Sequence, residues 1–84
     1  MDLATFKEIH RNAKPQQKLF LLAQTIERVG DCRVNCAEAR RNRNNDEAEY
    51  YDRERRAQDD RAQWLYSEIW NYLDEIERTD NDWK

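Results

Sequence analysis

Hydrophobic residues recur three and four positions apart along most of this chain. That spacing places them on one face of a helix and predicts a first helix over about residues 3–13. Asp2 suits the N-cap position, where its side chain can accept a backbone hydrogen bond. Pro15 ends this helix, because the residue before a proline avoids the α region. The stripe of this helix consists of Leu3, Phe6, Ile9 and Ala13.

A second stripe predicts a long helix over about residues 16–43. Gly30 interrupts the pattern, which resumes at once, so we expect a nearly continuous helix that bends at Gly30. The stretch RRNRNND, residues 40–46, is typical of a turn, because asparagine tolerates the left-handed region. The stripe consists of Leu19, Leu22, Ile26, Val29, Cys32, Cys36 and Ala39.

The third stripe predicts a helix over about residues 46–78. Asp46 and Glu47 favour a helix start here, since acidic groups stabilise a helix N-terminus. Residues 79–84, which include Trp83, are expected to form a frayed tail. The predicted core face carries Ala62, Leu65, Tyr66, Ile69, Leu73 and Ile76, with Trp70 and Tyr72 at its edges.

The chain holds one glycine and one proline, which is too few for the turns of a β-rich fold. We therefore predict an all-α fold in a single domain, residues 1–84. The two long helices form an antiparallel hairpin, and the N-terminal helix packs on its base to give a small three-helix bundle. If facing positions add up to about 90, Leu22 meets Ile69 and Ile26 meets Leu65. This register predicts an apolar base and a charged tip.

The two halves of the chain differ in charge, although the net charge is only −3. Residues 1–43 carry nine basic and five acidic side chains, and residues 44–84 carry six and thirteen. The acidic half argues against simple electrostatic binding to nucleic acid. No secretory leader or membrane-spanning run is visible, so we expect a cytoplasmic protein with reduced cysteines.

Few residues suggest chemistry. Cys32 and Cys36 lie one helical turn apart, but His10 is the sole histidine and falls on another helix. We therefore expect no metal site and interpret both cysteines as packing residues, with a reactive Cys36 thiol beside Arg55 as an alternative. No catalytic arrangement or phosphate-binding loop is recognisable. The sequence predicts a protein that is not an enzyme and needs no cofactor.

Two places are candidates for binding a partner. The tip combines arginines with aromatic residues, which anchor many protein interfaces and can also stack on bases. A tryptophan near the middle of the third helix falls opposite the predicted core face, and tryptophan is enriched at binding hot spots. The candidate residues are Arg40, Arg41, Arg43, Tyr50, Tyr51 and Trp64.

These features favour a non-enzymatic protein–protein interaction module. Short, charged, helical chains of this kind are common among small phage proteins that bind and block a host protein, as inhibitors or adaptors. The acidic half could act by nucleic-acid mimicry on a host protein that handles nucleic acid. The alternative is a nucleic-acid-binding protein that uses the Arg/Asn-rich tip, and self-association as a homodimer is a third hypothesis.

Overall fold

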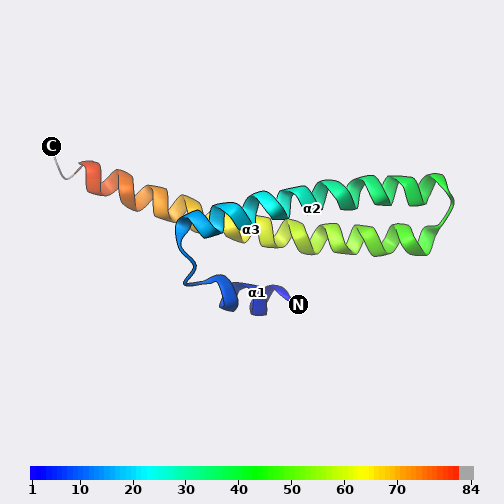
Figure 1. The fold of residues 1–84 in the computed structure, drawn as a ribbon, viewed down its shortest axis with the longest axis horizontal. Helices are drawn as coiled ribbons and strands as arrows, with labels where there is room; N and C mark the ends of the chain where they lie inside the picture. The colour runs from blue at the N-terminus through cyan, green and yellow to red at the C-terminus, as the bar shows by residue number, and fades with distance from the viewer. Residues whose placement is uncertain (82–84) are drawn as a thin grey trace.

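The computed structural model describes residues 1–81, and the side chains of residues 1–78. Three helices follow one another: α1 (Leu3–His10), α2 (Pro15–Arg41) and α3 (Asn45–Asn81), with no strand among the described residues. α2 and α3 run antiparallel along their length, and α1 lies beside the base of the hairpin (Figure 1). The all-α three-helix bundle predicted from the sequence is confirmed. Its shape is a rod of 61 × 24 × 14 Å.

α1 is shorter than predicted, because it ends at His10 and not near residue 13. Asp2 caps it: Asp2 Oδ1 accepts a hydrogen bond of 2.8 Å from the Thr5 backbone N–H. Pro15 begins α2 as its first residue, where the missing N–H is not needed. The Gln17 side chain supports this start by accepting a hydrogen bond of 3.1 Å from the Lys14 backbone N–H.

α2 continues without a break through Gly30. A methyl group built at Gly30 would meet no atom within 4 Å, so no close approach requires glycine there. The predicted continuity of this helix is therefore confirmed.

The turn between α2 and α3 closes over three residues, and an arginine takes its left-handed position. Arg43 has φ 58°, in the region that glycine or asparagine usually fills. The Asn44 N–H donates to the Ala39 carbonyl at 2.8 Å, and the Arg43 N–H donates to the Arg40 carbonyl at 3.1 Å. These two bonds form a Schellman motif, which gives hydrogen-bond donors to the last backbone carbonyl groups of α2. Asn44 then caps α3, because its Oδ1 accepts from the Glu47 N–H at 3.2 Å.

This turn sets the register of the hairpin, which differs from the predicted one. The Lys18–Glu68 ion pair and the Cys36–Ala48 hydrogen bond join positions that add up to 86 and 84, not to about 90. The reason is that the turn is centred on residue 43, about two residues before the predicted centre. The predicted facing of Ile26 with Leu65 is therefore wrong: Leu65 is fully buried and Ile26 is 58% exposed.

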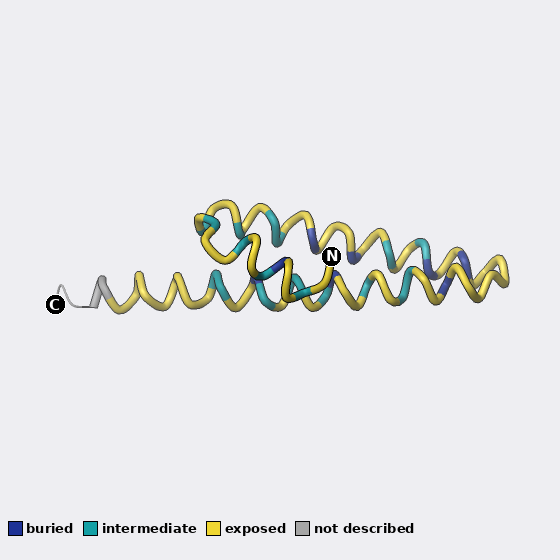
Figure 2. The backbone as a smooth tube through the Cα atoms, turned by 90° about the horizontal axis from the view of Figure 1, so that it is seen from below, coloured by how far each residue is buried: buried dark blue, intermediate teal, exposed yellow. Residues whose placement is uncertain are grey.

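The core is small: one cluster of buried residues lies near the tip, and the other buried residues are spaced along the hairpin (Figure 2). Cys36, Ala39 and Ala48 form the cluster near the tip. Small side chains allow α2 and α3 to approach closely there, and Tyr51 packs against Cys36, Ala39 and Ala48. The predicted division into an apolar base and a charged tip is thus incomplete, because the tip also holds a small buried cluster. Predicted core residues that are instead exposed are Ile9, Leu19, Ile26, Tyr66, Leu73 and Ile76.

The last part of α3 projects beyond the rest of the bundle (Figure 1). Since Lys18 faces Glu68 and α2 begins at Pro15, the end of α3 beyond about residue 71 has no neighbour on α2. Residues 71–78 are all exposed. α3 includes residues 79–81 of the predicted tail, whereas Trp83 lies outside the described residues. Among the described helices, none combines the length and apolar character that crossing a bilayer needs.

Candidate interaction surfaces

The structure brings the five predicted tip residues together at one end of the rod. Arg40, Arg41 and Arg43 are exposed at the end of α2 and in the turn. The rings of Tyr50 and Tyr51 contact each other edge to face on the first turns of α3, with centroids 5.3 Å apart. Tyr51 is half-buried on the small core, whereas Tyr50 is 53% exposed. Tyr50 and the arginines can thus meet a partner while Tyr51 supports them.

The charges of the tip are only partly neutralised within the chain. Asp52 binds Arg55 at 3.2 Å and Arg56 at 3.1 Å, so this carboxylate is occupied on α3 itself. In the described part of the chain, Arg40, Arg41 and Arg43 form no ion pair. Their guanidinium groups therefore remain available for a carboxylate or a phosphate. We define the tip surface as Arg40, Arg41, Arg43 and Tyr50.

Trp64 does not lie on a free polar face, as the sequence suggested. It is half-buried under α1, and its ring meets Phe6 edge to face with centroids 5.9 Å apart. Lys18 Nζ lies 5.9 Å from the Trp64 ring, over its face. Arg61 completes this contact: its guanidinium lies 5.2 Å from the Phe6 ring and donates to the Met1 carbonyl at 2.6 Å. Trp64 therefore anchors α1, and its predicted contact with a partner stays untested.

Both cysteines are free thiols on the side of α2 that faces α3. Cys36 is buried, and its Sγ donates to the Ala48 carbonyl at 3.4 Å. Burial raises the pKa of the Cys32 thiol, and the carboxylates of Glu54 and Asp31 raise it further. This direction favours the unreactive protonated form of Cys32. Across residues 1–81, no group of three or more His, Cys, Asp and Glu side chains is placed to hold a metal ion.

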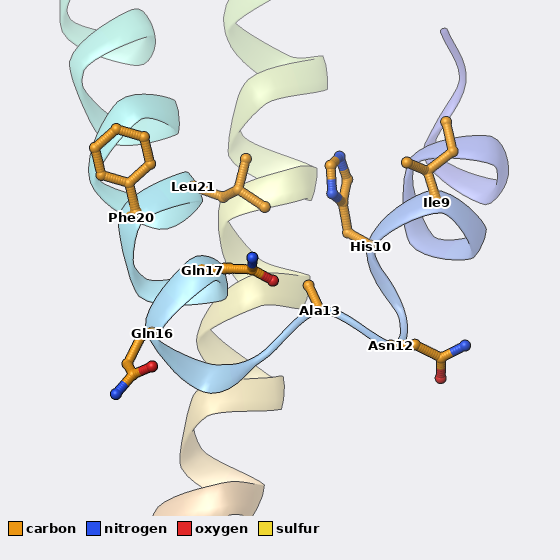
Figure 3. A pocket seen from close by; sticks show the side chains of 8 residues that line it. All are labelled: Ile9, His10, Asn12, Ala13, Gln16, Gln17, Phe20 and Leu21. Atoms are coloured by element: carbon orange, nitrogen blue, oxygen red, sulfur yellow. The ribbon is translucent and has the colours of Figure 1, made fainter.

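An open groove of about 690 Å³ lies between α1 and the start of α2 (Figure 3). The side chains of Phe20 and Leu21 from α2 and His10 and Ala13 from the α1 side line it. Amide groups of Gln16, Gln17 and Asn12 form the rest of its wall, so the groove offers no charged group that would select a ligand.

A second apolar surface lies on the opposite side of the hairpin from α1. Leu22 and Ile26 of α2 and Ala62 and Tyr66 of α3 line one groove of about 480 Å³. Leu19 continues this stripe on α2, and Trp70 and Leu73 continue it on α3, because these residues follow at three- and four-residue steps. We call this surface the open face; it consists of Leu19, Leu22, Ile26, Ala62, Tyr66, Trp70 and Leu73.

Sequence reasoning assigned the open face to the core, so it missed this surface. The signal was present in the excess of apolar positions: two helices with broad stripes offer more apolar surface than one mutual contact can cover. The register decides which part of each stripe stays outside. Trp70 was placed at the edge of the core, and in the structure it is 55% exposed and contacts Tyr66 edge to face.

Comparisons of this chain with protein family models, with curated proteins and with solved structures gave no match.

Proposed function

We propose that this chain is a non-enzymatic protein–protein interaction module that recognises its partner with the tip surface. The observation that carries the proposal is the set of three arginines without an ion-pair partner among the described residues, beside the exposed Tyr50. Arginine and tyrosine are the residue types that most often anchor protein interfaces. The capped turn and the small core under Tyr51 hold these side chains on a rigid end, which lowers the entropic cost of binding.

The charge around the tip favours a protein partner over a nucleic acid. Asp46, Glu47 and Glu49 lie on the first turns of α3, next to the arginines of the turn. These carboxylates would repel a phosphate backbone, while a protein surface can offer acidic and basic groups side by side. The partner expected from this chemistry offers carboxylates to the arginines and basic groups to the nearby acids, with an apolar rim that accepts Tyr50.

The finer form of the proposal is a small phage-type inhibitor or adaptor that blocks a host protein, and it rests on size and composition. Acidic nucleic-acid mimicry is a weaker version of the mechanism. Basic side chains within the chain already bind Asp52, Asp59, Glu68 and Asp74, which leaves fewer carboxylates for a basic groove.

The test is capture with the tagged full chain from a nuclease-treated lysate of the source organism or its host. Wild type is compared with Arg40→Ala/Arg41→Ala and with Tyr50→Ala. The matched control is Arg28→Ala/Arg78→Ala, which removes the same charge at exposed positions outside the tip. We expect one dominant protein that wild type and control retain and the tip variants lose.

Two results would contradict the proposal. Retention of the same protein by both tip variants would place the contact elsewhere. Material that is held before nuclease treatment and lost after it would indicate nucleic acid, and binding to labelled DNA or RNA should then fall steeply with salt.

A further inference from the structure

Within the described residues, the open face is an apolar surface that the contact between α2 and α3 leaves uncovered. Ile26 is 58% exposed, and Tyr66 and Trp70 are each 55% exposed. α1 cannot cover this surface, because it is held by Trp64 on the other side of α3. Trp64 and Tyr66 are two residues apart, and a helix turns about 100° per residue, so their side chains leave α3 in nearly opposite directions. A two-helix layer with an apolar stripe needs another element against it.

The projecting end of α3 also carries exposed apolar side chains. Its apolar stripe continues through Leu73 and Ile76, which are 48% and 41% exposed, with no neighbour on α2. Residues 71–81 extend for about 15 Å at the rise of an α-helix. The groove of the open face is lined on α3 by residues 59–67, which span about 12 Å. One exposed helix end therefore matches one exposed groove in length, and both carry apolar side chains.

We propose that the occupant of the open face is a second copy of this chain. The projecting end of α3 from each copy lies in the groove between α2 and α3 of the other. The two α3 helices then cross antiparallel about a two-fold axis near Trp70. In this arrangement Leu73 of one copy lies near Tyr66 and Ser67 of its partner, and each apolar stripe meets its own symmetry mate.

The charges along the open face determine the direction of the pairing. Towards the tip the α2 side of this face turns basic, because Arg33 and Arg40 follow Ile26 at seven-residue steps. On α3, Arg55 precedes Ala62 by seven but is paired with Asp52 and Asp59. A dimer with parallel, fully overlapping hairpins would stack these arginines against each other. The antiparallel arrangement overlaps only the bases, so it buries the apolar part and keeps the basic parts apart.

The area is sufficient for a stable pair. The half-exposed apolar side chains of the open face and of the projecting end offer roughly 600 Å² per copy, about 1,200 Å² for the pair, which is the lower limit of specific interfaces. The dimer is independent of the proposed partner of the tip surface. It would display two tip surfaces at opposite ends of a longer rod.

Sedimentation equilibrium of the full chain tests the association. At roughly 100 µM, where a micromolar interface is saturated, we expect twice the mass of one chain. Ile26→Glu changes the groove and Leu73→Glu changes the projecting end; each should raise the dimer Kd by more than about tenfold, because a carboxylate would be buried unpaired. Val34→Glu is the matched control, since Val34 is 65% exposed on α2 but lies eight residues nearer the tip than Ile26, beyond the bases that overlap in this arrangement.

Spin-label distances test the direction. In a Cys32→Ser/Cys36→Ala background whose helicity is checked by circular dichroism, a label at Asn45→Cys should give an interchain distance of about 75 Å, and a label at Asp60→Cys about 30 Å. A wild-type monomer at this concentration, or a dimer that persists in Ile26→Glu and Leu73→Glu, would overturn the proposal. Tip labels close together would overturn the antiparallel arrangement. The tip variants should leave the mass unchanged, so failure of the tip proposal is recognisable separately.

Discussion

The Phe6 ring meets the Trp64 ring edge to face, with centroids 5.9 Å apart and an angle of 80° between the ring planes. This contact is an apolar link between α1 and the hairpin. Phe6 is the one buried residue of α1, so removal of its ring should release the whole helix. We expect Phe6→Ala to lower the free energy of unfolding by about 3 kcal/mol. Urea denaturation measures the loss, and hydrogen exchange should show faster exchange in α1.

The control for this prediction is Phe20→Ala, which removes the same ring at a position that is 64% exposed. It should change stability by less than about 0.5 kcal/mol. Equal losses in the two variants would mean that α1 is not held through Phe6.

Gly30 weakens α2 without a structural need for glycine. Because a methyl group at this position meets no atom within 4 Å, Gly30→Ala should raise the free energy of unfolding by about 1 kcal/mol. Ala57→Gly, on the exposed side of α3, is the reverse substitution and should lower the free energy of unfolding by about the same amount. Thermal and urea denaturation of both variants give the comparison. A destabilised Gly30→Ala would show that α2 bends at this glycine in solution.

Gln58 places an unsatisfied amide oxygen inside the hairpin. The residue is buried, and its Oε1 has no hydrogen-bond partner. A leucine of similar size removes this desolvated acceptor, so Gln58→Leu should raise the free energy of unfolding by about 1 kcal/mol. Gln24→Leu, at an exposed position of α2, should stay within about 0.5 kcal/mol of wild type. If Gln58→Leu is destabilising, the amide must form a bond, for example to water, that this variant loses.

Arg43 holds the left-handed position of the Schellman motif, which costs a residue with a Cβ atom about 1 kcal/mol. Arg43→Gly should therefore raise the free energy of unfolding by about 0.5–1 kcal/mol, although it removes an arginine of the tip surface. Arg41→Gly removes the same charge from the last turn of α2 and should lower stability by a similar amount. Urea denaturation separates the two. Arg43→Gly should thus raise stability while it weakens binding by the tip surface, whereas Arg41→Gly should lower both.

The free energy of unfolding should depend on pH through the Cys32 thiol. Its pKa is raised by burial and by Glu54 and Asp31, so the folded state binds the thiol proton more tightly than the unfolded state. The folded state is then favoured below the ordinary thiol pKa, and stability is lost as the pH rises from about 8.5 through the raised value. Cys32→Ala should reduce this loss relative to wild type. Urea midpoints of both proteins between neutral and alkaline pH measure the difference, and parallel curves would contradict it.

The sequence by itself determined the helices and their order. Apolar residues at three- and four-residue steps, the single proline at residue 15 and the asparagine-rich turn are local signals, and local hydrogen bonds and side-chain volumes decide helix boundaries to within a few residues. The ends of α1 and α3 were the largest errors, at about three residues each. Residue preferences also predict asparagine in the left-handed position of the turn. Arg43 occupies this position, because the two hydrogen bonds of the Schellman motif fix the geometry at that residue.

Only the tertiary structure decided which apolar residues are buried. Because the turn is centred about two residues earlier than predicted, different residues of α2 and α3 face each other. Ile26 is therefore not opposite Leu65, and it stays exposed. The position of α1 also follows from long-range packing. Because α1 packs on Trp64, this residue anchors α1 and does not stand alone on a polar face. The five predicted tip residues lie together, since the turn itself gathers them. The open face could not be read from either helix alone, because it is formed by what their mutual contact leaves uncovered.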